Sequence, residues 1–300
     1  MIIRKSGKWK WAGVAGIALI AVIIGSIFFP NAEPTMSREK SVKQLYEAAG
    51  NSAVETTVIA ADDHSDLYKI YYPRKLDKPS AVIVWGNGTG ALPDNYDPLL
   101  THLASWGFIV IDTFSKTTGT GKEILEAAEY MIAENSVKTS LFYKKINIGK
   151  IGSAGHSQGS TGVINAHTNY ENGKVFKTVV SIALPALKWC DPKDVYDTSL
   201  IKVPFFVFAG SRDFIVSPSS SNRQAIDNTS STLSALAATA IGAGHTEIEK
   251  DGGKHRGYLT AWMRYQLMGD EQAMRAFVGS AAEIAADPDI KLIVAKNLSK

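Results

Sequence analysis

A short glycine-flanked pentapeptide contains the first residues whose types and spacing could do chemistry. Residues 155–159 read Gly-His-Ser-Gln-Gly, with Ser157 at the centre. Glycines two positions either side of a serine let a strand turn sharply into a helix, where a Cβ atom would meet neighbouring backbone. A serine presented on such a turn can attack a carbonyl carbon once a base takes its proton. We interpret Ser157 as a candidate nucleophile; a glycine-rich turn that only packs is the alternative.

Two further side chains follow this serine in the order that the chemistry needs. Asp213 lies just after the apolar run 205–209, and His245 lies in a glycine-rich loop after residues 236–241. An imidazole can take the serine proton, and a carboxylate can hold that imidazole in one tautomer. Taken singly, Asp213 could cap a helix and His245 could be a surface residue. The order Ser, Asp, His favours the catalytic interpretation of all three.

The remaining acids and histidines fit these roles less well. Asp112 ends another predicted strand, residues 108–112, but it precedes the candidate nucleophile and breaks the order. We interpret the other five histidines as structural or surface groups: His64, His102, His156, His167 and His255.

A second glycine-rich run is a candidate donor of hydrogen bonds to the oxyanion that forms during acyl transfer. It reads Trp-Gly-Asn-Gly-Thr-Gly over residues 85–90, after a predicted strand. Two backbone N–H groups are needed, one of them from the residue after the nucleophile, here Gln158. Gly88 or Thr89 would supply the other. A phosphate-binding loop is the alternative, but the run has neither a following lysine nor G-x-G-x-x-G spacing.

Three aromatic side chains near these positions are candidates for a substrate pocket: Trp85, Trp189 and Phe214. Aromatic rings offer a large apolar contact area, although packing in the core would use the same property. No group of His, Cys and carboxylate residues shows metal-ligand spacing, and the single Cys190 removes the common zinc patterns. We expect neither a metal nor another cofactor.

The elements that must position these residues alternate along the chain. An antiparallel pair is predicted at 54–60 and 67–72. It is followed by strands at 81–85, 108–112, 146–153, 178–183, 205–209 and 236–241, and by helices at 96–106, 122–134, 158–168, 219–226 and 256–268. This alternation predicts an α/β fold with a mostly parallel central sheet flanked by helices. Since about twenty residues separate the strands at 178–183 and 205–209, we expect no large lid domain and an open site.

The N-terminal segment has a different composition. Four basic residues precede position 11, and residues 12–29 form an apolar run closed by Pro30. This length favours a transmembrane anchor over a signal peptide, and the basic flank predicts a cytoplasmic N-terminus. We expect an anchor or signal peptide at 1–30, a linker at 31–36 and the catalytic domain at 37–300. That domain would be extracytoplasmic, and secreted if the segment is cleaved.

Overall charge and composition narrow the class of protein further. The 300 residues are 45% hydrophobic and 20% charged, which is typical of a globular chain. The net charge of +3 is smaller than the positive charge of the N-terminal segment alone, so the rest is nearly neutral. A near-neutral body offers no basic patch for a phosphate backbone, and we expect no nucleic-acid partner.

Several of these stretches resemble the polyesterase-like α/β-hydrolases, which include bacterial cutinases and polyethylene terephthalate hydrolases, with dienelactone hydrolases and plant chlorophyllases as distant relatives. The resemblance spans about residues 66–270 and rests on the pentapeptide and on residues 81–90, 103–113, 210–213 and 244–246. It implies an α/β-hydrolase fold and hydrolysis of accessible carboxylic esters through an acyl-enzyme. It also implies oxyanion donors at Gln158 and at Gly88 or Thr89.

Three departures from the family pattern bear on the substrate. Gln158 stands where polyester-degrading members usually have methionine, and Gly88 stands where they have an aromatic ring. With one cysteine, the terminal disulfide typical of them cannot form. These differences favour a small-ester or lipid-ester substrate over a polyester.

The residues therefore predict a serine hydrolase that cleaves carboxylic esters. Three alternatives stay open at this stage: acyl transfer to another alcohol, thioester hydrolysis by the same residues, and a membrane-tethered binding protein that has kept the fold and lost the chemistry.

Overall fold

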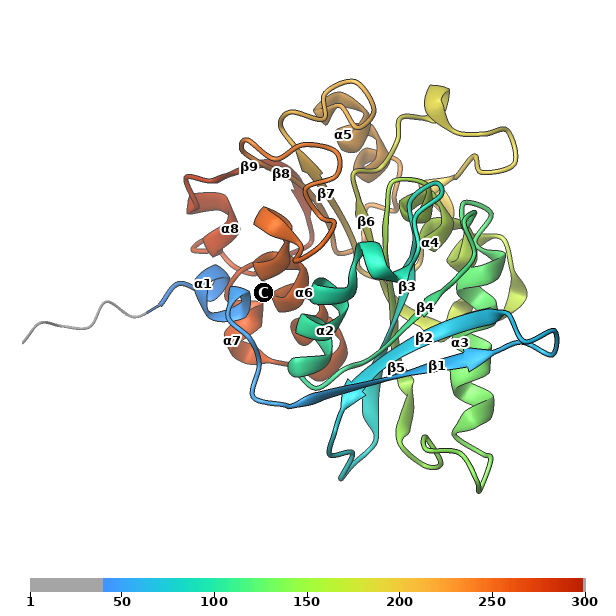
Figure 1. The fold of residues 1–300 in the computed structure, drawn as a ribbon. Coiled ribbons are helices and arrows are strands. Elements are labelled where there is room, and N and C mark those ends of the chain that lie inside the picture. Colours follow the sequence, from blue (N-terminus) through green and yellow to red (C-terminus); the bar gives the residue numbers. More distant parts are fainter. Residues whose placement is uncertain (1–39, 299–300) are drawn as a thin grey trace, which may run out of the picture. The chain divides into compact units, whose positions relative to one another are not determined.

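A nine-stranded sheet runs through the part of the chain that the structure, a computed structural model, describes, residues 40–298 (Figure 1). The strand order is β1-β2-β4-β3-β5-β6-β7-β8-β9. The strands from β4 to β8 in that order are parallel to one another, whereas β1, β2 and β9 add antiparallel edges. Their bounds are β1 (Val54–Ala60), β2 (Asp66–Pro73), β3 (Ser80–Gly86), β4 (Ile109–Thr113), β5 (Ile146–His156), β6 (Phe176–Ile182), β7 (Phe205–Gly210), β8 (Ala235–Ala240) and β9 (Ile290–Lys296).

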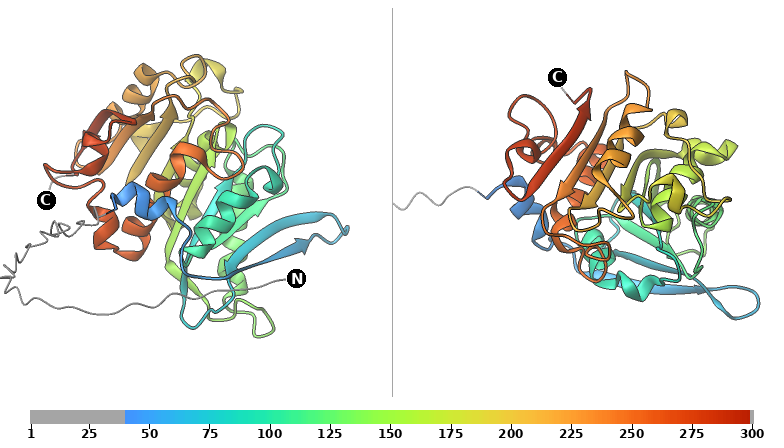
Figure 2. Two further views of the ribbon diagram at one scale, coloured as in Figure 1. Left: turned by 60° about the vertical axis from the view of Figure 1, so that its left-hand side comes forward. Right: turned by 90° about the horizontal axis from the view of Figure 1, so that it is seen from above.

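Helices cover both faces of the sheet (Figure 2). One hydrophobic core lies under α1 (Val42–Glu47), α2 (Asp97–Ser105), α6 (Arg256–Met268), α7 (Glu271–Met274) and α8 (Glu283–Ala286). The other core lies under α3 (Lys122–Glu134), α4 (Gln158–Thr168) and α5 (Ser219–Asp227). The predicted α/β fold, with a mostly parallel sheet flanked by helices, is confirmed.

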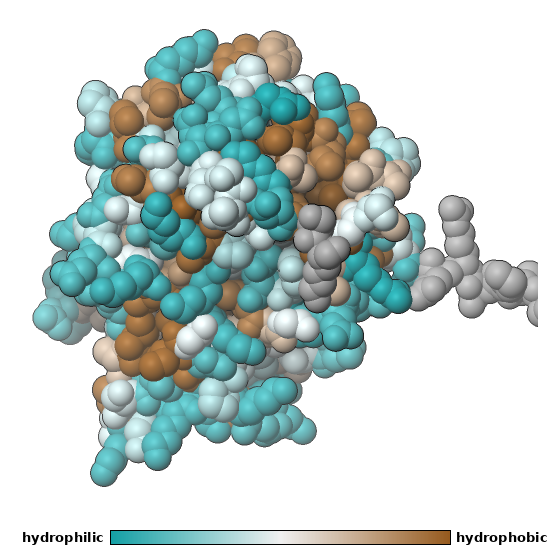
Figure 3. Space-filling model, turned by 180° about the vertical axis from the view of Figure 1, so that it is seen from behind, coloured by the Kyte–Doolittle hydropathy of each residue, from teal (hydrophilic) through white to brown (hydrophobic). Residues whose placement is uncertain are grey.

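The central strands are buried on both sides, as their continuous apolar sequences predict. Every residue of β4, β7 and β8 is buried. The outer surface is mixed: seen from behind, hydrophilic side chains surround several separate hydrophobic patches (Figure 3). Because its central strands are buried on both faces, the sheet is a rigid support for the loops at its ends.

Four loops meet at one edge of this sheet. In a parallel sheet the strands end on the same side, and ligands bind where the strand order reverses. Here the reversal lies between β3 and β5, because β4 pairs with the other side of β3. The loops after β3, β5, β7 and β8 carry the predicted nucleophile, acid, base and oxyanion donors, whereas Trp189 lies in the connection between β6 and β7.

The connection between β6 and β7 contains only two short 3-10 turns, Leu187–Trp189 and Thr198–Leu200. No lid domain lies there, in line with the prediction. The C-terminal part differs from the prediction, which placed no helix or strand after residue 268: α7, α8 and strand β9 form there, and β9 pairs antiparallel with β8.

The predicted membrane segment at 12–29 and the linker at 31–36 lie outside the described residues. The compact body of the chain begins at residue 40. Within residues 40–298, no helix combines the length and hydrophobicity needed to cross a bilayer. Helix α1 begins at Val42, where Ser41 and Gln44 form a capping box.

Candidate active site

The turn from β5 into α4 presents Ser157 at the edge of the sheet. Its backbone has φ 53°, a conformation that a residue with a side chain adopts at a cost. The flanking glycines make the turn fit, since a Cβ on Gly155 would overlap the Gly159 carbonyl and one on Gly159 would overlap the Gly86 carbonyl. This is the geometry that the pentapeptide predicts.

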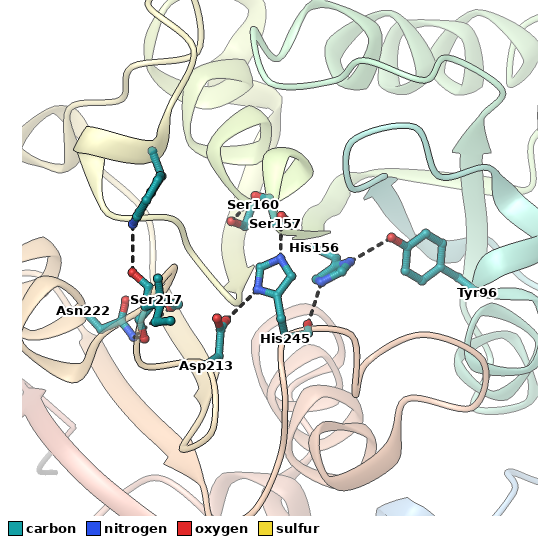
Figure 4. A network of polar contacts seen from close by, with 10 residues as sticks. Tyr96, His156, Ser157, Ser160, Asp213, Ser217, Asn222 and His245 are labelled. Atoms are coloured by element: carbon teal, nitrogen blue, oxygen red, sulfur yellow. Dashed lines mark hydrogen bonds and ion pairs between the residues drawn. The ribbon is translucent and has the colours of Figure 1, made fainter.

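The side chains of Ser157, His245 and Asp213 lie in one hydrogen-bonded row (Figure 4). His245 Nδ1 is 2.7 Å from Asp213 Oδ2, and His245 Nε2 is 2.9 Å from Ser157 Oγ. Because a carboxylate accepts, Nδ1 carries the proton that is donated to Asp213. Nε2 is then free to accept the Ser157 hydroxyl proton.

The surrounding elements hold this row in place. Asp213 follows β7 in a turn that is closed by a hydrogen bond from the Asp213 N–H to the Gly210 carbonyl. The Asp213 side chain is only 3% exposed. Gly210 lets the next loop approach, because a Cβ there would overlap the Ala243 carbonyl. His245 remains 30% exposed, so its ring faces both the buried acid and the cleft. The arrangement can transfer a proton from Ser157 while stabilising the resulting imidazolium.

A second, buried row lies beside the first. His156 Nε2 is 2.8 Å from the His245 carbonyl oxygen, and His156 Nδ1 is 2.9 Å from Tyr96 Oη (Figure 4). A carbonyl only accepts, so Nε2 carries the ring proton and Nδ1 accepts from the Tyr96 hydroxyl. Burial lowers the pKa of His156 to about 3, which keeps the ring neutral. The sequence reading of His156 as a structural group agrees with this position.

The same row distinguishes the two candidate N–H groups of the glycine loop. Gly88 N–H donates to Tyr96 Oη at 3.1 Å and is buried. Thr89 lines the cavity beside Ser157, and within residues 40–298 no hydrogen bond occupies its N–H. Gln158 lines the same cavity.

The cavity in front of Ser157 has a volume of about 540 Å³. Its walls come from the glycine loop, the start of α4, the β6–β7 connection and the loops after β7 and β8. The lining residues are Thr89, Ser157, Gln158, Thr161, Pro185, Trp189, Cys190, Asp191, Asp194, Val216 and His245. Both polar and apolar side chains line it. It opens to solvent, as expected for a site without a lid.

Of the three aromatic residues predicted to line a pocket, only Trp189 does so. The prediction for Trp85 is wrong: its side chain points from β3 into the core, is 0% exposed and packs against Tyr96. The prediction for Phe214 is also wrong, because that ring is 69% exposed and lies outside the cavity wall.

Sequence reasoning missed Asp194, which is 2% exposed and forms part of the cavity wall. Its Oδ2 accepts a 2.7 Å hydrogen bond from the side chain of Gln158. No local pattern in residues 187–200 marks this aspartate, since only the fold brings it to α4. Within residues 40–298, no group of three or more His, Cys, Asp or Glu side chains is placed to hold a metal ion.

Comparison with known proteins adds a family to this geometry. A curated relative, bis(hydroxyethyl) terephthalate hydrolase of Streptomyces coelicolor, is 26% identical over 174 residues, which cover 52% of this chain and 53% of the relative. The chain therefore spans about half the length of that relative. The family model described as PET hydrolase-like matches residues 33–291, which is most of the chain. On this match, the chain belongs to the PET hydrolase-like family.

Proposed function

We propose that this protein hydrolyses carboxylic esters, with Ser157 as nucleophile, His245 as base and Asp213 as the group that orients the base. The observation that carries the proposal is the unbroken row of hydrogen bonds from Asp213 to Ser157 on a strained strand-to-helix turn. Membership of the PET hydrolase-like family supports the same reaction class.

The reaction would proceed in two halves. His245 Nε2 takes the Ser157 proton while Oγ attacks the ester carbonyl carbon, and Asp213 stabilises the imidazolium. The imidazolium then protonates the departing alcohol, leaving an acyl-serine. In the second half, His245 deprotonates a water molecule that attacks the acyl group, and Ser157 is regenerated.

The oxyanion of each tetrahedral intermediate would accept from the N–H groups of Thr89 and Gln158. Thr89 is a better candidate than Gly88 because the Gly88 N–H already donates to Tyr96, inside the protein. Gln158 begins α4, so the partial positive charge of that helix end adds to the stabilisation.

The relative's name describes an enzyme for a small aromatic diester, bis(hydroxyethyl) terephthalate. We propose small esters as substrates here too. A cavity of about 540 Å³ lies within the size range of small-molecule sites, and Trp189 at its rim offers an aromatic surface.

The test compares the full chain with Ser157→Ala on p-nitrophenyl esters of graded acyl length. We expect wild-type turnover with a preferred chain length, and a loss of at least about a thousandfold in kcat for the variant. Ser199→Ala, a change at an exposed serine outside the cavity, is the matched control and should keep the wild-type rate.

Equal rates in wild type and Ser157→Ala would contradict the proposal. A folded wild-type protein that neither turns over any ester nor reacts with an active-site phosphonate would instead favour a binding protein. An acyl transferase would form new esters when excess alcohol is added, which chromatography of the products would detect.

A further inference from the structure

The buried carboxylate of Asp194 is an unusual component of an ester-binding cavity. It stands in the connection between β6 and β7 and lines the cavity together with Ser157 and Gln158. At 2% exposure it has lost almost all of its hydration. Gly119 leaves room for the Asp194 carboxylate, because a Cβ at position 119 would overlap it.

The partners of this carboxylate satisfy it only in part. Oδ2 accepts from Gln158 Nε2 at 2.7 Å, whereas Oδ1 has no hydrogen-bond partner among residues 40–298. No Lys, Arg or His of that range forms an ion pair with it. Burying a carboxylate with no cation beside it and with one oxygen unpaired lowers the stability of the fold. We therefore look for a function of Asp194 that offsets this loss.

Gln158 shows what kind of group Asp194 can receive. Its amide N–H is the donor that reaches the carboxylate, while its own Oε1 is buried without a partner. Gln158 is half-buried and lines the cavity, so its amide stands between the carboxylate and a bound ligand. A donor group of the substrate that replaced this amide would form a charge-assisted hydrogen bond with Asp194, and the Gln158 side chain would then hydrogen-bond to water.

We propose that Asp194 is a specificity-determining residue that selects esters carrying an ammonium or hydroxyl group and disfavours esters carrying a carboxylate. This inference rests on the ester hydrolysis proposed above. None of the residues that line the cavity is a lysine or arginine, so a substrate carboxylate would find no counter-charge in the wall. Lys188 lies over the Trp189 ring at 5.3 Å but is exposed, where water and salt weaken its field.

Asp191 supplies a matched control. It is an acid of the same connection and lines the same cavity, but its side chain is exposed. Solvent screens an exposed charge far more than a buried one. The proposal therefore assigns the selection to Asp194 and predicts a much smaller contribution from Asp191.

The experiment measures kcat/KM of the full chain for p-nitrophenyl esters of ε-aminocaproic, caproic and adipic acid, which differ in the charge at the far end. A second series keeps the acyl group constant, as butyrate esters of aminohexanol, hexanol and hydroxycaproate, and follows acid release. The proteins are wild type, Asp194→Asn and Asp191→Asn. The uncharged ester in each series reports the overall activity of each variant and normalises the ratios.

We expect wild type to prefer the ammonium ester over the carboxylate ester by about tenfold or more in at least one series. Asp194→Asn should bring that ratio close to one, whereas Asp191→Asn should change it less than about threefold. The wild-type ratio should also persist at high salt, because a buried charge is poorly screened.

Wild-type and Asp194→Asn ratios that agree in both series would overturn the inference while leaving the proposed hydrolysis intact. If wild type turned over none of the esters, the result would instead contradict the proposed function. If Asp194→Asn does not fold, inhibition of wild type decides: hexylammonium should compete with the caproate ester more strongly than caproate anion does, and the reverse order would refute the selection.

Discussion

At the scale of single residues, the Tyr96 hydroxyl joins two loops that the reaction needs. It accepts from the Gly88 N–H and donates to His156, which in turn donates to the His245 carbonyl. Tyr96 itself is fully buried against Trp85. The glycine loop next to Thr89 and the loop of the base are thereby held by one chain of neutral hydrogen bonds, away from the substrate.

Replacing Tyr96 with phenylalanine removes this link without leaving a cavity. Gly88 N–H and His156 Nδ1 would each lose a buried partner, and we expect the free energy of unfolding to fall by about 1–3 kcal/mol. We also expect kcat to fall while KM changes little, because the oxyanion donor and the base lose alignment rather than substrate contacts. Urea unfolding and steady-state kinetics on one ester check both. A variant with wild-type stability and kcat would show that Tyr96 positions nothing.

These residues differ in how far sequence alone could find them. Ser157, Asp213 and His245 stand in local patterns, a glycine-flanked turn and two strand ends, and the structure brings their side chains into hydrogen-bond contact. Tyr96 and Asp194 act through neighbours 60 and 36 positions away in the chain. No local spacing encodes such contacts, and the same limit explains why Trp85 appeared to be a pocket residue.

At the scale of elements, strand β9 secures the end of helix α5. Lys296 on β9 donates from Nζ to the carbonyl oxygens of the last two residues of that helix, Ile226 and Asp227, at 2.8 and 3.0 Å. It also donates to the Thr229 carbonyl, just beyond the helix, at 3.2 Å. The last carbonyls of a helix lack intrahelical partners and carry partial negative charge. An ammonium group placed there both satisfies them and complements the helix dipole.

We expect Lys296→Met to lower the free energy of unfolding by about 1–2 kcal/mol, since three carbonyls lose a charged donor. Lys291→Met, on the same strand but exposed, is the control and should change stability by less than about 0.5 kcal/mol. Urea unfolding of both variants beside wild type measures the difference. Equal losses in the two variants would mean that the strand, and not the cap, matters.

The elements themselves were predictable where their patterns are long. Helices α3, α4 and α6 begin and end at the predicted residues, because each has a regular apolar periodicity bounded by glycine or a strand end. Strand β9 was not predicted: its residues are mostly half-exposed and show no clean alternation, and its pairing with β8 arises only when the chain folds back.

At the scale of the whole molecule, histidines whose pKa is lowered by burial link stability to pH. Burial lowers the pKa of His156 to about 3 and that of His255 to about 4. It also lowers the pKa of His102 to about 4 and that of His167 below its usual value. His255 is 1% exposed and packs edge-on against Phe208. In the unfolded chain a histidine titrates near 6.5, so below that pH the unfolded state binds protons that the folded state refuses.

Stability from these groups is therefore complete above about pH 6.5 and is lost as pH falls towards 4. Each of these histidines should contribute up to about 1.4 kcal/mol per pH unit to the fall in the free energy of unfolding near pH 5, beyond what the carboxylates contribute. His255→Leu keeps the packing against Phe208 and removes one proton, so the slope near pH 5 should fall by about 1.4 kcal/mol per pH unit. The variant should gain stability relative to wild type as the pH is lowered from 7 to 5. Urea unfolding at several pH values, with the exposed His64→Leu as control, measures both slopes; parallel curves for wild type and His255→Leu would show that acid acts elsewhere in the fold.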